Sequence, residues 1–92
     1  MKVRYAASAR LDIDEIHEFV SQKNPIAASN IVEAIREAAD RLGEFPYIGH
    51  SGRLPGTYEW TVRGLPYIIV YEVHEERREV TVLGVFHGAQ NR

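Results

Sequence analysis

The sequence contains no cysteine and no long apolar run. Without cysteine there is no disulfide framework, no thiol nucleophile and no thiolate metal ligand, which is compatible with a reducing compartment. No segment approaches the ~20 apolar residues that a membrane-spanning helix needs, and residues 1–5 are not followed by the apolar stretch of a secretory signal. We therefore expect a cytoplasmic protein that does not contact the membrane.

Excess positive charge is also missing, because the formal net charge is −2. Proteins that depend on contacts with nucleic-acid phosphates usually carry a basic stripe, since neutralised phosphates release counterions. The composition, 45% hydrophobic and 26% charged, is that of an ordinary globular domain. The sequence thus predicts one domain over residues 1–92 whose activity does not rest on phosphate contacts.

Two segments have the apolar spacing of amphipathic helices. In the first, apolar residues recur on one stripe at Ala9, Ile13, Ile16 and Val20. Ser8 is the predicted N-cap of this helix. The second begins at Asn24-Pro25, a cap followed by proline at the first helical position, and is predicted to end at Gly43. Only residues 21–23 separate the two, which predicts an antiparallel helical hairpin.

β-branched and aromatic residues dominate four further segments. Strands are predicted over residues 3–5, 58–63, 67–73 and 79–86. The run 67–73 is apolar on both faces except at its end, which places it at the centre of a sheet. The predicted fold is α+β in the order β-α-α-β-β-β, with a mainly antiparallel sheet and the helical hairpin packed on one face.

Residues that could carry chemistry are few. His50-Ser51 lacks a third orienting residue and a nucleophile elbow, so serine catalysis is not predicted. The four histidines fall on different elements without the spacing of a zinc motif; they are His17, His50, His74 and His87. The carboxylate clusters are interpreted as solvated charge; they are Asp12, Asp14 and Glu15, and Glu75 and Glu76. We therefore predict no metal site and no cofactor.

Two other positions stand out. Residues 43–57 form a long connection, and Arg53 within it is either part of a loop ordered by Phe45 and Tyr47 or a recognition side chain held on a Gly/Pro-stiffened loop. His87 closes the last strand, where we expect it near Arg63 or Tyr71, and it is either a structural histidine or a functional one.

The order of these elements resembles the ParE/RelE family of toxins from bacterial type II toxin–antitoxin pairs. The resemblance covers nearly the whole chain. It rests on Ala9, Asp12, Ile13 and Ile16, on Leu42, Phe45-Pro46 and Gly49, on Gly52-Arg53 and Pro55-Gly56, and on Tyr67, Tyr71 and His87-Gly88-Ala89. It implies a cognate antitoxin as partner, with any DNA contact made through that antitoxin, and a role in plasmid stabilisation.

The family implies one of two targets. RelE-like members are ribosome-dependent mRNA endoribonucleases that hold RNA with basic residues on the sheet, whereas ParE-like members poison DNA gyrase. Where the ribonucleases commonly carry arginine after the first tyrosine of the central strand, this chain has Ile68, and their C-terminal tyrosine has no counterpart after His87. We therefore predict a gyrase-binding, ParE-like protein; the alternatives are a RelE-like ribonuclease and a non-toxic relic that only binds antitoxin.

The predicted target-binding residues are Arg53, Arg63 and His87, and these three are also the candidate catalytic residues if the chain is an enzyme. We expect them to share one rim of the sheet. Because the helical hairpin covers one face, the antitoxin is expected on the helices and their flanks and the target on the other face and its rim.

Overall fold

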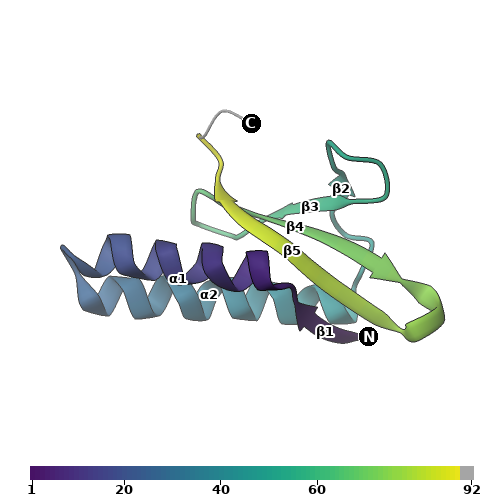
Figure 1. Cartoon of the computed structure of the whole chain (residues 1–92), viewed down its shortest axis with the longest axis horizontal. Coiled ribbons are helices and arrows are strands. Elements are labelled where there is room, and N and C mark those ends of the chain that lie inside the picture. Colours follow the sequence, from purple (N-terminus) through teal and green to yellow (C-terminus); the bar gives the residue numbers. More distant parts are fainter. Residues whose placement is uncertain (90–92) are drawn as a thin grey trace.

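The computed structural model describes residues 1–89 and shows an α+β fold. Its elements are β1 (Lys2–Tyr5), α1 (Ala7–Ser21), α2 (Pro25–Glu44), β2 (His50–Ser51), β3 (Tyr58–Thr61), β4 (Tyr67–His74), a short 3-10 helix (Glu75–Arg77) and β5 (Glu79–His87). The helices lie side by side as a hairpin against one face of the sheet (Figure 1). The predicted fold class and the one-sided helical layer are confirmed.

The sheet has five strands in the order β1-β5-β4-β3-β2. β4 lies at its centre, as its two-sided apolar pattern predicted, and is antiparallel to both β3 and β5. β1 pairs with β5 in parallel, from Lys2 opposite Glu79 to Tyr5 opposite Val82. The two-residue strand β2 was not predicted, since His50 and Ser51 have no strand pattern and pair only through the register with Glu59 and Tyr58.

The helix boundaries confirm one predicted cap and contradict two other predictions. Asn24 caps α2 by accepting a hydrogen bond from the backbone N–H of Ala27 at 3.0 Å, and Pro25 opens the helix. Ser8 does not cap α1, because the helix already begins at Ala7; the Ser8 hydroxyl donates instead to the carbonyl of Leu83 at 2.5 Å.

Gly43 does not end α2, which continues to Glu44. A Cβ at position 43 would lie 2.6 Å from the carbonyl oxygen of Met1 and 2.8 Å from a methyl group of Val3. The glycine is therefore required by the close approach of β1 to the helix, and the amino group of Met1 donates to the Gly43 carbonyl at 2.7 Å. Gly43, which predicted the end of the helix, thus marks a close contact between α2 and β1.

The core fills the space between the helical hairpin and the sheet. Its fully buried large side chains come from both layers: Ile35, Leu42, Ile69, Tyr71, Val80 and Val82. None of the helices within residues 1–89 is long and apolar enough to cross a membrane. No helix of residues 1–89 covers the opposite face of the sheet (Figure 1).

Tyr71 connects this core to the long connection after α2. Its side chain is fully buried, and its hydroxyl donates to the carbonyl of Pro46 at 2.8 Å and accepts from the N–H of Gly49 at 3.1 Å. Tyr58 stacks on its ring with centroids 5.5 Å apart. Burial raises the pKa of the Tyr71 hydroxyl, although the bond from Gly49 acts in the opposite direction. The hydroxyl therefore stays protonated and can hold both backbone groups.

We predict that Tyr71→Phe destabilises the protein, because it removes the partner of two backbone groups while leaving the ring in place. An unmade hydrogen bond of this kind costs about 1–3 kcal/mol, and in a domain of this size 1 kcal/mol lowers Tm by roughly 4–8 °C. Thermal unfolding followed by circular dichroism measures the change.

Tyr58→Phe is the matched control, since it keeps the stacked ring and removes a hydroxyl that has no hydrogen bond to any other described residue. Equal Tm values for the two variants would contradict the anchoring role of Tyr71.

Candidate functional site

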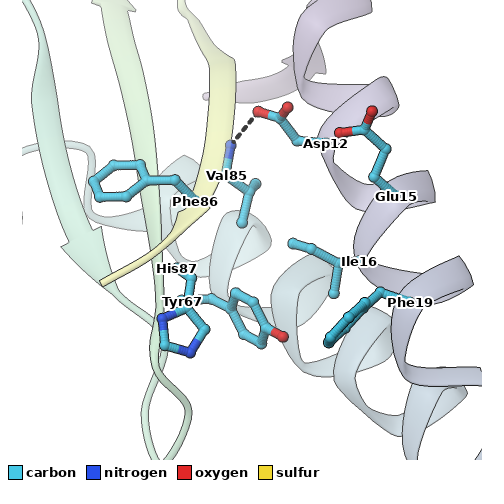
Figure 2. A pocket seen from close by; sticks show the side chains of 8 residues that line it. All are labelled: Asp12, Glu15, Ile16, Phe19, Tyr67, Val85, Phe86 and His87. Atoms are coloured by element: carbon cyan, nitrogen blue, oxygen red, sulfur yellow. Dashed lines mark hydrogen bonds between the residues drawn. The ribbon is translucent and has the colours of Figure 1, made fainter. Parts of the chain in front are cut away.

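A groove of about 550 Å³ opens between α1 and the end of β5. Residues from three elements line this α1–β5 groove: Asp12, Glu15, Ile16, Phe19, Tyr67, Val85, Phe86 and His87. Figure 2 shows the carboxylates of Asp12 and Glu15 at one end and the side chains of Ile16, Phe19 and Tyr67 toward the other. Pockets of about 300–1,000 Å³ with mostly apolar walls and a few polar groups are typical binding sites.

His87 is held in this groove by strand pairing. It pairs with Tyr67 across β4 and β5, and the two rings meet edge to face at 5.6 Å. The N–H of Gly88 donates to the carbonyl of Pro66 at 2.6 Å, and the N–H of Ala89 donates to Nδ1 of His87 at 3.1 Å. Because Nδ1 accepts, the neutral ring carries its proton on Nε2.

His87 is near Tyr67 rather than Tyr71, which contradicts one of its two predicted neighbours. Tyr71 pairs with Val82, well before the end of β5. The prediction that His87 lies on a surface away from the helices is also wrong, since it lines a groove with α1. Both errors come from the register between β4 and β5, which sequence alone does not specify.

Asp12 connects α1 to β5 at an irregular point of the sheet. Val70 pairs with Gly84 and Tyr71 with Val82, so that Leu83 is left over as a β-bulge. One carboxylate oxygen of Asp12 accepts a hydrogen bond from the N–H of Val85 at 2.9 Å. A Cβ at position 84 would lie 3.0 Å from this oxygen, so glycine leaves room for it. The interpretation of Asp12 as simply solvated charge is therefore wrong.

The other predicted site residues lie at two ends of the sheet. Arg63 lies in the turn between β3 and β4, at the same end as His87, because Val62 and Tyr67 close that turn with a hydrogen bond of 2.9 Å. Arg53 lies in the loop between β2 and β3, beyond the end of β3 where Tyr58 pairs with Tyr71.

From Tyr71 to Tyr67 the strand β4 advances by four residues, or about 13 Å. Arg53 is therefore separated from His87 along the sheet, and Figure 1 shows the β2–β3 loop and the end of β5 at opposite ends of the sheet. The expectation of one rim shared by all three residues is wrong. Two sequence-adjacent turns of a meander point in opposite directions, which explains the separation.

The loop that carries Arg53 is held in place by the side chain of Glu59 in β3. Glu59 alternates with apolar residues in β3, yet only 4% of it is exposed. The backbone N–H of Arg53 donates to the carboxylate of Glu59 at 3.4 Å. The N–H of Gly52 donates to the carbonyl of Thr57 at 2.8 Å and closes the loop. Phe45 and Tyr47, which were expected to order residues 43–57, are 54% and 50% exposed, so that part of the interpretation is wrong. The segment is held instead by these hydrogen bonds and by those of Tyr71, while a recognition role for Arg53 stays a prediction.

The face of the sheet opposite the helices carries little positive charge. Its side chains on the three inner strands include Thr61, Ile68, Val70, Glu72, Thr81 and Phe86. None of β3, β4 and β5 contains a lysine or an arginine. The cations of this face lie at its margins, and two of them, Arg4 and Arg77, contact the carboxylate of Glu79 at 3.5 and 3.3 Å.

Desolvation acts to raise the pKa of the Glu79 carboxyl, but the hydrogen bond from Arg77 and the charge of Arg4 outweigh it and the net pKa is lowered. Glu79 therefore stays ionised and neutralises part of the positive charge available at this edge. The open face consequently offers an apolar and acidic surface rather than a phosphate-binding one.

Catalytic constellations are not formed by the predicted polar residues. The ring of His50 contacts the backbone carbonyl of Ser51 at 3.1 Å rather than its hydroxyl, so the pair has no nucleophile–base geometry. Among residues 1–89, no group of three or more histidine or carboxylate side chains is arranged to hold a metal ion.

Comparison with known proteins gives a consistent result. Residues 3–92 match the family model described as the ParE toxin of the type II toxin–antitoxin system parDE. A Sinorhizobium fredii protein named putative toxin Y4kP is 35% identical over 89 residues, covering 97% of this chain and 90% of that protein.

Solved structures share the fold. The chromosomal ParDE system of P. aeruginosa includes a chain that superposes with a TM-score of 0.81 at 22% identity, with 95% of each chain covered. A chain of the RelBE2 toxin–antitoxin complex of Mycobacterium tuberculosis superposes with a TM-score of 0.69 at 27% identity, covering 94% of this chain and 95% of that one.

We predict that Asp12→Ala lowers the free energy of unfolding by about 1–3 kcal/mol, because the N–H of Val85 loses its partner. Asp12→Asn should recover most of this loss, since the amide oxygen can accept the same hydrogen bond. Urea unfolding measures both changes.

Glu15→Ala removes a carboxylate from the same groove that has no hydrogen bond within residues 1–89, and should change stability by less than about 0.5 kcal/mol. A loss in Glu15→Ala as large as in Asp12→Ala would show that groove charge, and not the bond to Val85, is responsible.

Proposed function

This chain belongs to the ParE toxin family of type II toxin–antitoxin systems, and we propose that it acts by binding DNA gyrase and is neutralised by a cognate antitoxin. The absence of lysine and arginine from β3, β4 and β5 is the observation that favours binding over RNA cleavage. Cleavage by a 2′-hydroxyl needs an acid, a base and cations that stabilise the developing phosphorane charge. The open sheet face offers Ile68, Val70 and Glu72 instead.

Arg63 and His87 are the proposed first contacts with the target, since they lie at one end of the sheet. Arg53 is a proposed second contact at the other end. A protein interface of standard size buries about 800 Å² per partner, which is wide enough to include both ends of a sheet this short. Arginine is frequent among residues that dominate binding energy, because its planar guanidinium makes several directed hydrogen bonds.

The proposed antitoxin is a small protein encoded next to this one. Members of the structurally similar ParDE and RelBE systems are toxin–antitoxin assemblies. In this chain, Phe19 is 73% exposed and borders the α1–β5 groove, so an apolar surface is available to a partner. With a net charge of −2, we expect any DNA contact to be made by the antitoxin.

We predict that this protein and the product of the adjacent open reading frame form a stable heterocomplex when they are co-expressed. The exposed apolar groove gives the physical reason, because a partner that covers it removes apolar surface from water. Size-exclusion chromatography should show co-elution at a mass above that of either chain, and separate elution would contradict the antitoxin proposal.

We further predict that the purified protein inhibits gyrase-dependent supercoiling and does not cut mRNA on translating ribosomes. Arg63→Ala and His87→Ala should each weaken inhibition by tenfold or more, the effect of losing about 1.4 kcal/mol or more of binding energy. Arg41→Ala is the matched control, an exposed arginine of α2 on the helix side of the molecule.

Three outcomes of these assays separate the alternatives. Ribosome-dependent cleavage that disappears in His87→Ala would overturn the proposal in favour of a RelE-like endoribonuclease. A protein that binds the antitoxin but does not inhibit gyrase, does not cleave mRNA and does not arrest growth would be a non-toxic relic. Full inhibition by folded Arg53, Arg63 and His87 variants would place the target surface elsewhere.

A further inference from the structure

We infer that the α1–β5 groove accepts a partner segment that inserts an apolar side chain and carries lysine or arginine beside it. The inference rests on the proposed function, because it describes the kind of antitoxin segment that would occupy this groove. Neither the fold nor family membership specifies the sign of the charge that the partner carries at this groove.

The apolar half of the groove comes from Ile16, Phe19 and Tyr67 (Figure 2). Phe19 is a large aromatic side chain that is nevertheless 73% exposed. It lines the α1–β5 groove instead of lying on a flat part of the surface. Covering such a side chain with a partner's apolar group removes both from water. A volume of about 550 Å³ is large enough for at least one bulky side chain together with its flanking backbone.

The charged half of the groove selects the sign of its partner. Asp12 and Glu15 place their carboxylates together at one end, and no lysine or arginine lines the groove within the described part of the chain. Helix α1 as a whole has four carboxylates against Arg10, which leaves a net charge of −3 with His17 neutral. A partner carboxylate would be repelled here, whereas a guanidinium or ammonium group would be attracted.

Asp12 is fixed in position before any partner arrives. Its bond from the N–H of Val85 at 2.9 Å uses one oxygen, and ties the carboxylate to the sheet. Because this side chain does not need to be ordered on binding, a cation that pairs with it avoids part of the usual entropic cost. Glu15 has no such bond among residues 1–89, so it can adjust to the cation's position.

Occupation of the groove also has a consequence for His87. That histidine forms part of the wall next to Tyr67, so a segment seated between α1 and β5 covers it. The proposed target contact and the partner site therefore overlap at His87, and binding of the segment excludes the target directly, without a conformational change.

The test uses two synthetic 14-residue peptides with identical leucine and phenylalanine positions, one carrying arginines and the other glutamates at every remaining charged position. We expect the arginine peptide to bind the full-length protein at least tenfold more tightly in an NMR titration at 0.05 M salt. The resonances of Phe19 and His87 should shift, and the preference should shrink at 0.5 M salt because the charges are screened.

Two matched pairs of variants locate the effect. Glu15→Lys should remove or reverse the preference, whereas Glu18→Lys, the same charge change outside the groove on the same helix, should leave most of it. Phe19→Ala should weaken binding at least fivefold, whereas Leu11→Ala, which removes another exposed apolar side chain of α1, should not. Thermal unfolding of all four should stay close to that of the parent protein.

Equal binding of the two peptides, equal effects of Glu15→Lys and Glu18→Lys, or no saturable shift at Phe19 and His87 would each overturn the inference. These results are distinct from failure of the proposed function. An antitoxin that co-elutes equally well with the Glu15→Lys protein would refute the groove specificity alone, whereas a charge-selective groove in a protein that does not inhibit gyrase would refute the proposed target alone.

Discussion

The structure depends on how the backbone N–H and C=O groups at one edge of β5 find hydrogen-bond partners. β5 extends over Glu79–His87, but β1 pairs with it only as far as Val82. Backbone groups at an unpaired edge need other partners or water. Helix α1 provides them, because the Ser8 hydroxyl donates to the Leu83 carbonyl and Asp12 accepts from the Val85 N–H. The helix therefore replaces the missing length of β1.

This replacement creates the groove. A helix is wider than a strand and cannot follow the edge closely. Space therefore remains between α1 and β5 beyond the hydrogen bond from the Val85 N–H to Asp12. Residues after that point, including His87, line the space. The β-bulge at Leu83 belongs to the same arrangement, because it turns the strand where Gly84 allows the Asp12 carboxylate to approach. Bulges of this kind often re-aim side chains near functional sites.

Charge is distributed in a way that suits protein partners. The inner strands have no cations, and the cations at the margins of the open face are partly neutralised by Glu79. The remaining features are an acidic, aromatic groove on the helix side and a firmly anchored loop at the far end of the sheet. The Tyr71 hydroxyl holds the segment that leads into this loop, by its bonds to Pro46 and Gly49. In the same segment Tyr47 hydrogen-bonds to Glu75, which raises the pKa of Tyr47 to about 12. The groove and the loop are thus two separate surfaces at different ends of the sheet.

The sequence alone determined the elements whose signals are local. Helical spacing and the Asn24-Pro25 start were enough for the hairpin, and the apolar run 67–73 was enough to place β4 at the centre of the sheet. The order of these elements with Phe45-Pro46 and His87-Gly88 was also enough for the family resemblance. Each signal lies within a few residues, where spacing and backbone preference act directly.

Only the tertiary structure decided which distant residues meet. Asp12 and Val85 are separated by 73 positions, and nothing local distinguishes Asp12 from the solvated Asp14. The register of β4 against β5 assigned Tyr67 to His87, and the alternating turns of the meander moved Arg53 away from it. Gly43 followed a helix-stop rule in sequence but serves a contact with β1. Pairing and packing fix these relations because they depend on the whole fold, whereas local propensity does not contain them.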